Sequence, residues 1–166
     1  MIRLSSGSAD DTRAIAAGIA GVLQPGDVVV LDGGLGVGKT TFVQGAVAAL
    51  GNAAVVTSPT FAIVQQYGGG PTEIAHVDAY RLDRVQELHD IGFDELLDGN
   101  TIVFVEWGER VRAMLPDDRV TVTLTMAYEQ GAPADDRTLV VEHLGDSWLA
   151  RAPELRAALS RYEVRH

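Results

Sequence analysis

The chain has 166 residues, of which 46% are hydrophobic and 22% are charged, a composition that excludes a disordered or fibrous protein and predicts one globular domain over residues 1–166. It lacks cysteine, which excludes disulfides, thiol nucleophiles and cysteine–zinc sites and fits a reducing compartment. The 13 basic and 23 acidic residues give a formal net charge of −10. Such a charge repels phosphate backbones and argues against an extended nucleic-acid surface.

The sequence predicts neither a targeting segment nor a membrane span. Residues 1–5 lack the apolar core of a secretory signal. Residues 40–72 carry no charge, but polar residues and Pro59 interrupt them, so no apolar run of about 18 residues forms. We therefore expect a soluble, cytoplasmic protein that does not contact a membrane.

The first predicted helix begins near Ser8, which forms a capping-box-like pair with Asp11, and ends at residues 25–26, a Pro-Gly pair. One face of this helix is apolar and consists of Ile15, Ile19, Val22 and Leu23. Residues 28–31 follow as an uninterrupted apolar run, which predicts a strand that is buried on both faces.

The remaining elements alternate between strands and helices. Residues 61–66, 73–77, 101–105, 120–126 and 138–142 are predicted strands, and residues 42–50, 83–90 and 148–162 are predicted helices. The last two strands are joined by the turn-rich residues 129–136, so we expect them to form an antiparallel pair. The whole pattern predicts an α/β fold with a mostly parallel central sheet flanked by helices.

A phosphate-binding motif follows the first buried strand. Residues 33–40 read Gly-Gly-Leu-Gly-Val-Gly-Lys-Thr and match G-x-x-x-x-G-K-[ST] at every fixed position. The glycines let backbone N–H groups turn toward phosphates, and the next helix adds its positive N-terminal end. Lys39 is the sole lysine of the chain, and we expect it to reach the outer phosphates while the Thr40 hydroxyl ligates Mg²⁺. The motif predicts a P-loop NTPase.

The same residues exclude several relatives of this class. A GTPase base-reading motif of the Asn-Lys-x-Asp type needs a second lysine, and a protein kinase needs a lysine on a later strand. The dinucleotide fingerprint G-x-G-x-x-G fails because its last position holds Lys39. By elimination, the favoured ligand is an adenine nucleotide.

A P-loop site also needs a carboxylate at the end of a neighbouring strand to hold the Mg²⁺ shell. Glu106 ends a uniformly apolar strand, and Asp78 ends a less uniform one, so both acids are candidates. His76 and His89 have no metal-ligand spacing, and we expect both to be structural. The sequence alone leaves the choice between the two acids open.

Four segments taken together resemble one family. These are residues 31–42, the Ser-Pro-Thr-Phe of residues 58–61, the His-x-Asp-x-Tyr-Arg of residues 76–81 and the Val-Glu-Trp of residues 105–107. They resemble the TsaE family (also called YjeE), small bacterial ATPases of tRNA threonylcarbamoyladenosine synthesis. The likeness spans about residues 8–145 and depends on the order of all four segments, because the phosphate loop alone is generic.

The resemblance implies ATP hydrolysis with Mg²⁺ and action through partners called TsaD and TsaB, with tRNA reached indirectly through that complex. It implies that Thr40 and Glu106 hold Mg²⁺, that Thr60 belongs to a switch-like loop, and that Asp78 is a second functional acid. The catalytic residues expected on this basis are Lys39, Thr60, Asp78 and Glu106. The expected nucleotide-binding residues are Gly33, Gly36, Val37, Gly38, Lys39, Thr40, Thr41, Glu109 and Arg137.

Two other functions compete with this one. Many P-loop kinases for small molecules have a similar length, although residues 110–112 hold the only tight pair of arginines here. A nucleotide-dependent binding module, in which turnover is incidental, is the third possibility. Tyr80, Arg81 and Trp107 can each serve a partner or the nucleotide, or simply pack into the scaffold.

Overall fold

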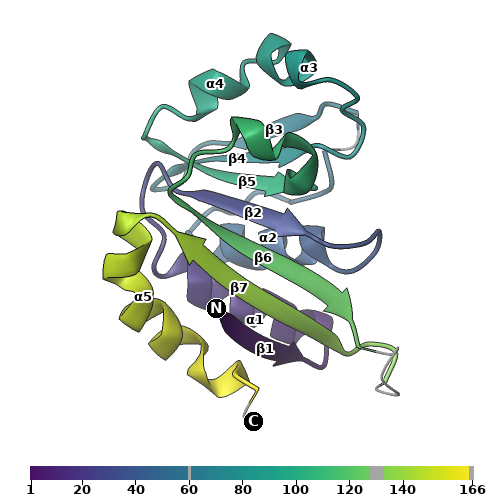
Figure 1. The fold of residues 1–166 in the computed structure, drawn as a ribbon, viewed down its shortest axis with the longest axis vertical. Coiled ribbons are helices and arrows are strands. Elements are labelled where there is room, and N and C mark those ends of the chain that lie inside the picture. The colour runs from purple at the N-terminus through teal and green to yellow at the C-terminus, as the bar shows by residue number, and fades with distance from the viewer. Residues whose placement is uncertain (60, 128–132, 165–166) are drawn as a thin grey trace.

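The computed structural model describes residues 1–59, 61–127 and 133–164. Seven strands form one mixed sheet in the order β1-β7-β6-β2-β5-β4-β3 (Figure 1). The strands are β1 (Ile2–Ser6), β2 (Val28–Asp32), β3 (Val64–Tyr67), β4 (Glu73–Asp78), β5 (Thr101–Glu106), β6 (Arg119–Met126) and β7 (Arg137–Leu144). The central strands β6, β2, β5 and β4 are parallel to one another, whereas β1, β7 and β3 pair antiparallel with their neighbours. The predicted mostly parallel centre and the C-terminal antiparallel pair are confirmed.

Helices cover both faces of the sheet. They are α1 (Ala9–Ala20), α2 (Lys39–Ala49), α3 (Val85–Asp90), α4 (Phe93–Leu96) and α5 (Asp146–Leu159), with the 3-10 helices η1 (Gly108–Met114) and η3 (Ser160–Tyr162). Side chains of α1, α2 and α5 join one buried cluster, and those of α3, α4 and η1 join a second. Along β2, Val29 and Leu31 belong to the first cluster and Val28 and Val30 to the second, as expected for a strand buried on both faces.

Helix α1 begins where the sequence predicts. The Ser8 hydroxyl oxygen accepts a hydrogen bond from the Asp11 backbone N–H at 3.1 Å, and the Asp11 carboxylate accepts one from the Gly7 N–H at 3.1 Å. The α1 backbone at Arg13 also passes so close to α2 that a Cβ on Gly45 would lie 2.4 Å from the Arg13 carbonyl oxygen. This close approach fixes α2, which carries the start of the candidate site, against α1.

The predicted strand at residues 61–66 is wrong in its first half. Strand β3 begins at Val64, and Ile63 has a left-handed backbone with φ of 62°. The Ile63 carbonyl accepts a hydrogen bond from the Asp78 N–H at 2.8 Å, so this turn aligns β3 antiparallel to β4. The C-terminal helix ends at Leu159 and continues as η3, whereas β1, α4 and η1 are elements that the sequence reading did not anticipate.

No helix within residues 1–59, 61–127 and 133–164 has the length and apolar character that crossing a bilayer requires.

Candidate nucleotide and metal site

The glycine-rich residues 33–38 connect the C-terminal end of β2 to the start of α2, as the sequence predicts. Gly33 has a φ of 138°, and a Cβ there would lie 2.4 Å from the Leu124 carbonyl oxygen, so only glycine fits. Helix α2 starts at Lys39, and its cap residue Gly38 has a left-handed backbone. The free N–H groups of this first turn give the cavity beside the loop a partial positive charge.

Lys39 is 5% exposed although it carries a charge. Its Nζ donates hydrogen bonds to the carbonyl oxygens of Gly33 at 2.7 Å and Gly34 at 2.8 Å. Burial lowers the pKa of the Lys39 ammonium below its ordinary value, while the charges of nearby carboxylates, chiefly Glu106, act in the opposite direction. The lysine is therefore folded back onto its own loop at the edge of the cavity.

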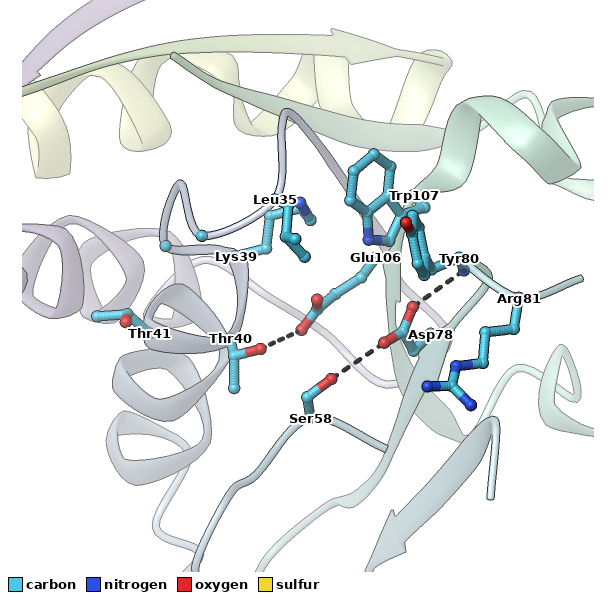
Figure 2. A pocket seen from close by; sticks show the side chains of 12 residues that line it. Leu35, Lys39, Thr40, Thr41, Ser58, Asp78, Tyr80, Arg81, Glu106 and Trp107 are labelled. Atoms are coloured by element: carbon cyan, nitrogen blue, oxygen red, sulfur yellow. Dashed lines mark hydrogen bonds between the residues drawn. The ribbon is translucent and has the colours of Figure 1, made fainter. Parts of the chain in front are cut away.

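A cavity of about 500 Å³ opens between the loop, the start of α2 and the ends of β4 and β5 (Figure 2). Its lining residues are Leu35, Gly36, Gly38, Lys39, Thr40, Thr41, Ser58, Asp78, Tyr80, Arg81, Glu106 and Trp107. The two acids come from neighbouring strands, because β4 and β5 are parallel and Asp78 is in register with Glu106. The cavity thus lies at the carboxyl edge of the sheet, where ligands of open α/β sheets bind.

Thr40 and Glu106 meet at the bottom of this cavity. The Thr40 hydroxyl donates a hydrogen bond of 2.9 Å to Oε1 of Glu106, which is 3% exposed (Figure 2). The same oxygen lies 2.8 Å from Nε2 of His76, a fully buried residue of β4. A hydroxyl and a carboxylate side by side are hard oxygen donors of the kind that Mg²⁺ prefers.

The donor set fits a magnesium ion that is held mostly by water and substrate oxygens. Among the residues that the structure describes, no group of three or more His, Cys, Asp and Glu side chains is arranged to hold a metal ion. Mg²⁺ commonly takes only one or two protein oxygens and fills its octahedron with water and phosphate. Thr40 and Glu106 supply such a pair.

Asp78 is fixed through both of its carboxylate oxygens. Oδ2 accepts a hydrogen bond from the Ser58 hydroxyl at 3.0 Å, and Oδ1 accepts one from the Tyr80 backbone N–H at 3.0 Å (Figure 2). Ser58 belongs to the predicted switch-like loop, but Thr60 of that loop lies outside the described residues. The contact joins this loop to the end of β4 and keeps the second acid facing the cavity.

Aromatic residues close the cavity on the side of η1. The Trp107 ring lies over the Lys39 ammonium, with 3.8 Å between Nζ and the ring centroid, and the Tyr80 ring packs against Trp107 at 4.9 Å between centroids. Trp107 has a left-handed backbone with φ of 60°, an unfavourable conformation for a bulky residue. The next residue must be small, because a Cβ on Gly108 would lie 2.1 Å from Cγ1 of Val30.

The structure places Arg137 and Glu109 away from this cavity. The Arg137 Nε donates a hydrogen bond of 3.1 Å to the Val37 carbonyl on the other side of the loop. There, Arg137 lines a separate cavity of about 120 Å³ together with Ala9, Thr12, Gly36, Gly38, Thr41 and Asp135. The Glu109 backbone N–H donates to Asp32 Oδ1 at 3.2 Å at the end of β2, and Val37 packs its side chain into the core.

The sequence reading missed His76, which contacts the site, and Asp32, which lies just before the loop and lines a different cavity. Asp32 ends β2, and burial, followed by a hydrogen bond with the Glu109 side chain and by the charge of Glu109, raises its pKa from 3.8 to about 6. A carboxylate after a buried strand was a usable signal, since the same signal pointed to Asp78 and Glu106. His76 was expected to be only structural, yet it contacts Glu106 directly.

Comparison with known proteins identifies relatives of this chain. The family model described as threonylcarbamoyl adenosine biosynthesis protein TsaE matches residues 6–137. The Bacillus subtilis protein named tRNA threonylcarbamoyladenosine biosynthesis protein TsaE is 35% identical over 146 residues, which cover 88% of each chain. The Treponema pallidum protein of that name is 42% identical over 123 residues, which cover 74% of this chain and 90% of the relative.

A solved structure extends the likeness to the whole fold. The crystal structure of YdiB from Bacillus subtilis superposes with a TM-score of 0.75 at 30% identity, covering 97% of both chains. The residues that match the family model include the glycine-rich loop, the start of α2 and the ends of β4 and β5, all of which line the cavity. The chain therefore belongs to the TsaE family.

Proposed function

We propose that this chain is a P-loop ATPase that binds Mg-ATP in the 500 Å³ cavity and hydrolyses it, in service of threonylcarbamoyladenosine formation in tRNA. The names of its relatives support the tRNA-modification role. The observation that carries the nucleotide proposal is the contact between Thr40 and Glu106 directly beside a loop of the phosphate-binding pattern. Lys39 is the residue before Thr40 at the start of α2, and its ammonium supplies a further positive charge that neutralises the phosphates.

Each group has a role that its position supports. The N–H groups at the start of α2 bind phosphate oxygens, and Lys39 exchanges the carbonyl oxygens of Gly33 and Gly34 for those of the phosphates. Thr40 and Glu106 hold Mg²⁺, which when bound neutralises charge on the transferring phosphoryl group. Asp78, fixed by Ser58 and the Tyr80 N–H, orients the attacking water.

The nucleoside end of the nucleotide would extend past the loop toward a second, smaller cavity. The 120 Å³ cavity there is lined by Thr41, which also lines the main cavity, and by Arg137. The loop would then lie along the phosphate chain, with the base at one end and the transferred phosphoryl group at the other. This arrangement gives Arg137 a nucleotide-contacting role, as the family resemblance implies.

We further propose that homologues of TsaD and TsaB complete the activity. The net charge of −10 disfavours direct binding of tRNA, so a partner that carries the tRNA is required. P-loop hydrolysis is often accelerated by an added arginine, and a partner can supply one in addition to Arg81, which lines the cavity. We expect slow ATP turnover by the chain alone, in the cytoplasm where tRNA is modified.

The test measures phosphate release from Mg-ATP by the wild-type chain and by Lys39→Ala, each with and without purified TsaD and TsaB, alongside modification of tRNA. We expect the wild type to release phosphate slowly alone and to support repeated modification cycles with the partners, while Lys39→Ala does neither. Arg84→Ala, in an exposed residue, is the control for loss of a positive charge. Equal phosphate release by Lys39→Ala, or phosphoryl transfer to an added metabolite, would contradict the proposal.

A further inference from the structure

His76 is a buried histidine whose two ring nitrogens both face polar groups. It is 0% exposed, and its Nε2 lies 2.8 Å from Oε1 of Glu106. Its Nδ1 lies 3.4 Å from the hydroxyl of Tyr67 in β3, and that hydroxyl donates to Oε1 of Gln65 at 3.3 Å. A continuous series of polar contacts therefore runs from β3 through β4 to the carboxylate at the end of β5.

The chemistry of these groups fixes which nitrogen carries the proton. An ionised carboxylate only accepts hydrogen bonds, so Nε2 must be the protonated nitrogen that donates to Glu106. Nδ1 faces the Tyr67 hydroxyl on the other side of the ring. Thr40 and His76 both donate hydrogen bonds to Oε1 of Glu106, so neither of these two bonds involves Oε2.

A carboxylate that is 3% exposed needs such donors, because an unpaired buried charge is strongly destabilised. Thr40 can keep donating to Glu106 when its oxygen ligates Mg²⁺, but its hydroxyl must then turn to suit the ion. His76 has no such second task and comes from β4, which is paired with β3 on one side and β5 on the other. Its position as a donor to the Glu106 carboxylate therefore does not depend on metal binding.

We infer that His76 is a positioning residue that, through its Nε2–H, orients the Glu106 carboxylate for Mg²⁺. The inference rests on the proposed function, because the role of Glu106 toward Mg²⁺ is part of that proposal. Partners of this kind, which orient metal-binding carboxylates, typically change metal affinity 10–100-fold when they are removed. Nucleotide binding without metal depends on the loop and Lys39, so it does not require His76.

The test compares His76→Gln with His76→Asn. Glutamine carries an amide N–H donor at about the position of Nε2, whereas the donor of asparagine lies nearer Nδ1 and does not reach Glu106. The measurement is ADP affinity by calorimetry, first with EDTA and then across a range of MgCl₂ concentrations. We expect His76→Asn to need roughly 10–100-fold more Mg²⁺ with unchanged affinity in EDTA, and His76→Gln to restore the Mg²⁺ requirement to within a few-fold of wild type.

A double-mutant cycle separates positioning from general loss of packing. In a Glu106→Gln background, His76→Asn should add no further Mg²⁺ requirement, because the group that it orients is already lost. His89→Asn, in an exposed residue, is the control for replacing a histidine. An unchanged Mg²⁺ requirement in His76→Asn, or a His76→Gln variant as impaired as His76→Asn, would overturn the inference while the proposed function stands.

A spectroscopic measurement does not depend on any variant at position 76 folding. Nitrogen-15 NMR of histidine-labelled wild-type protein reports which ring nitrogen of His76 carries the proton. We expect Nε2 to carry a proton, with a signal that moves in Glu106→Gln. A ring protonated at Nδ1 alone would overturn the inference. If the ADP affinity of the wild-type protein does not change with MgCl₂ concentration, the proposed function is overturned as well. Failure of the inference and failure of the proposed function are therefore distinguishable.

Discussion

The ammonium of Lys39 lies 3.8 Å from the centroid of the Trp107 ring, so an indole covers the sole lysine of the chain. Such cation–π contacts contribute about 0.5–2 kcal/mol depending on their exposure to water. Lys39 also donates hydrogen bonds to two carbonyl oxygens of its own loop. An anion that draws the ammonium away from these oxygens also draws it away from the indole and so changes the environment of Trp107.

Tryptophan fluorescence provides the first prediction. The chain has two tryptophans, and Trp148 is fully buried in the cluster beneath α5, away from the cavity. We expect Mg-ADP to change the emission of Trp107 alone. The change should disappear in Trp107→Phe and persist in Trp148→Phe, and a response that survives in Trp107→Phe would contradict the assignment of the cavity.

The two acids should separate metal binding from hydrolysis. Glu106→Gln should raise the Mg²⁺ requirement and slow hydrolysis sharply, because it removes the charge beside Thr40. Asp78→Asn should bind Mg-ATP almost normally and hydrolyse it poorly, by a factor of about 10²–10⁴ if it orients the attacking water. Glu142→Gln, an exposed acid of β7, is the matched control. A metal defect in Asp78→Asn instead would exchange the two roles.

Stability should depend on the ionisation of Asp32. Its pKa is about 6 in the folded protein against 3.8 ordinarily, so between these values the folded protein binds the proton more tightly than the unfolded chain does. Stability therefore falls as pH rises through this window, by at most about 3 kcal/mol at roughly 1.4 kcal/mol per pKa unit.

Asp32→Asn removes this titration and keeps an oxygen that can accept from the Glu109 N–H. We expect the variant to be more stable than wild type at pH 8 and to lose that advantage at pH 4, as measured by urea unfolding at both pH values. The variant also loses the ion pair between Asp32 and Arg112, which are 3.9 Å apart. This loss makes the gain in stability at pH 8 smaller but does not reverse its dependence on pH. An advantage that is larger at pH 4 than at pH 8 would show that the sign is wrong.

The close packing of α1 on α2 predicts that Gly45→Ala destabilises the protein, although helix propensity alone predicts the opposite. Alanine is preferred over glycine inside a helix by about 1 kcal/mol. At Gly45, however, the new Cβ would lie 2.4 Å from backbone atoms of Arg13, which cannot rotate away. We expect Gly45→Ala to lower the free energy of unfolding by about 1–3 kcal/mol.

The control for this change is Gly34→Ala, because a Cβ on Gly34 would meet no neighbouring atom within 4 Å and the residue has no left-handed φ. We expect Gly34→Ala to stay within about 0.5 kcal/mol of wild type in chemical unfolding. A Gly45→Ala protein as stable as wild type would mean that the two helices separate at low cost.

Sequence patterns within one segment predicted those parts of the site that lie within a single loop or strand. The glycine and lysine spacing placed the loop, although α2 begins at Lys39 and not at residue 42 as predicted. Apolar runs ending in acids placed the ends of β4 and β5. The alternation along β4 even indicates that His76 and Asp78 share one face of the sheet. The contact of His76 with Glu106 depends on the register between β4 and β5, which no local pattern encodes.

Other elements depend on distant partners or on strain. Strand β1 alternates buried Ile2 and Leu4 with exposed residues, but it is short and stable only through pairing with β7, at the other end of the chain. The left-handed turn at Ile63, which shortened β3, violates the preference of a β-branched residue, so sequence propensity favoured a strand there. Trp107 also has a left-handed backbone, which a bulky side chain disfavours. The residue after it, Gly108, cannot be replaced because Val30 occupies the space that a side chain would need.

The position of β2 in the sheet has a consequence for synthesis on the ribosome. Both strands that flank β2 are made after it, because β5 ends at Glu106 and β6 ends at Met126. The apolar strand therefore emerges long before either neighbour and stays without its pairing partners while about half of the chain is translated. We expect chains that stop before β5 to expose it and to aggregate or to recruit chaperones, although they already contain the complete phosphate loop.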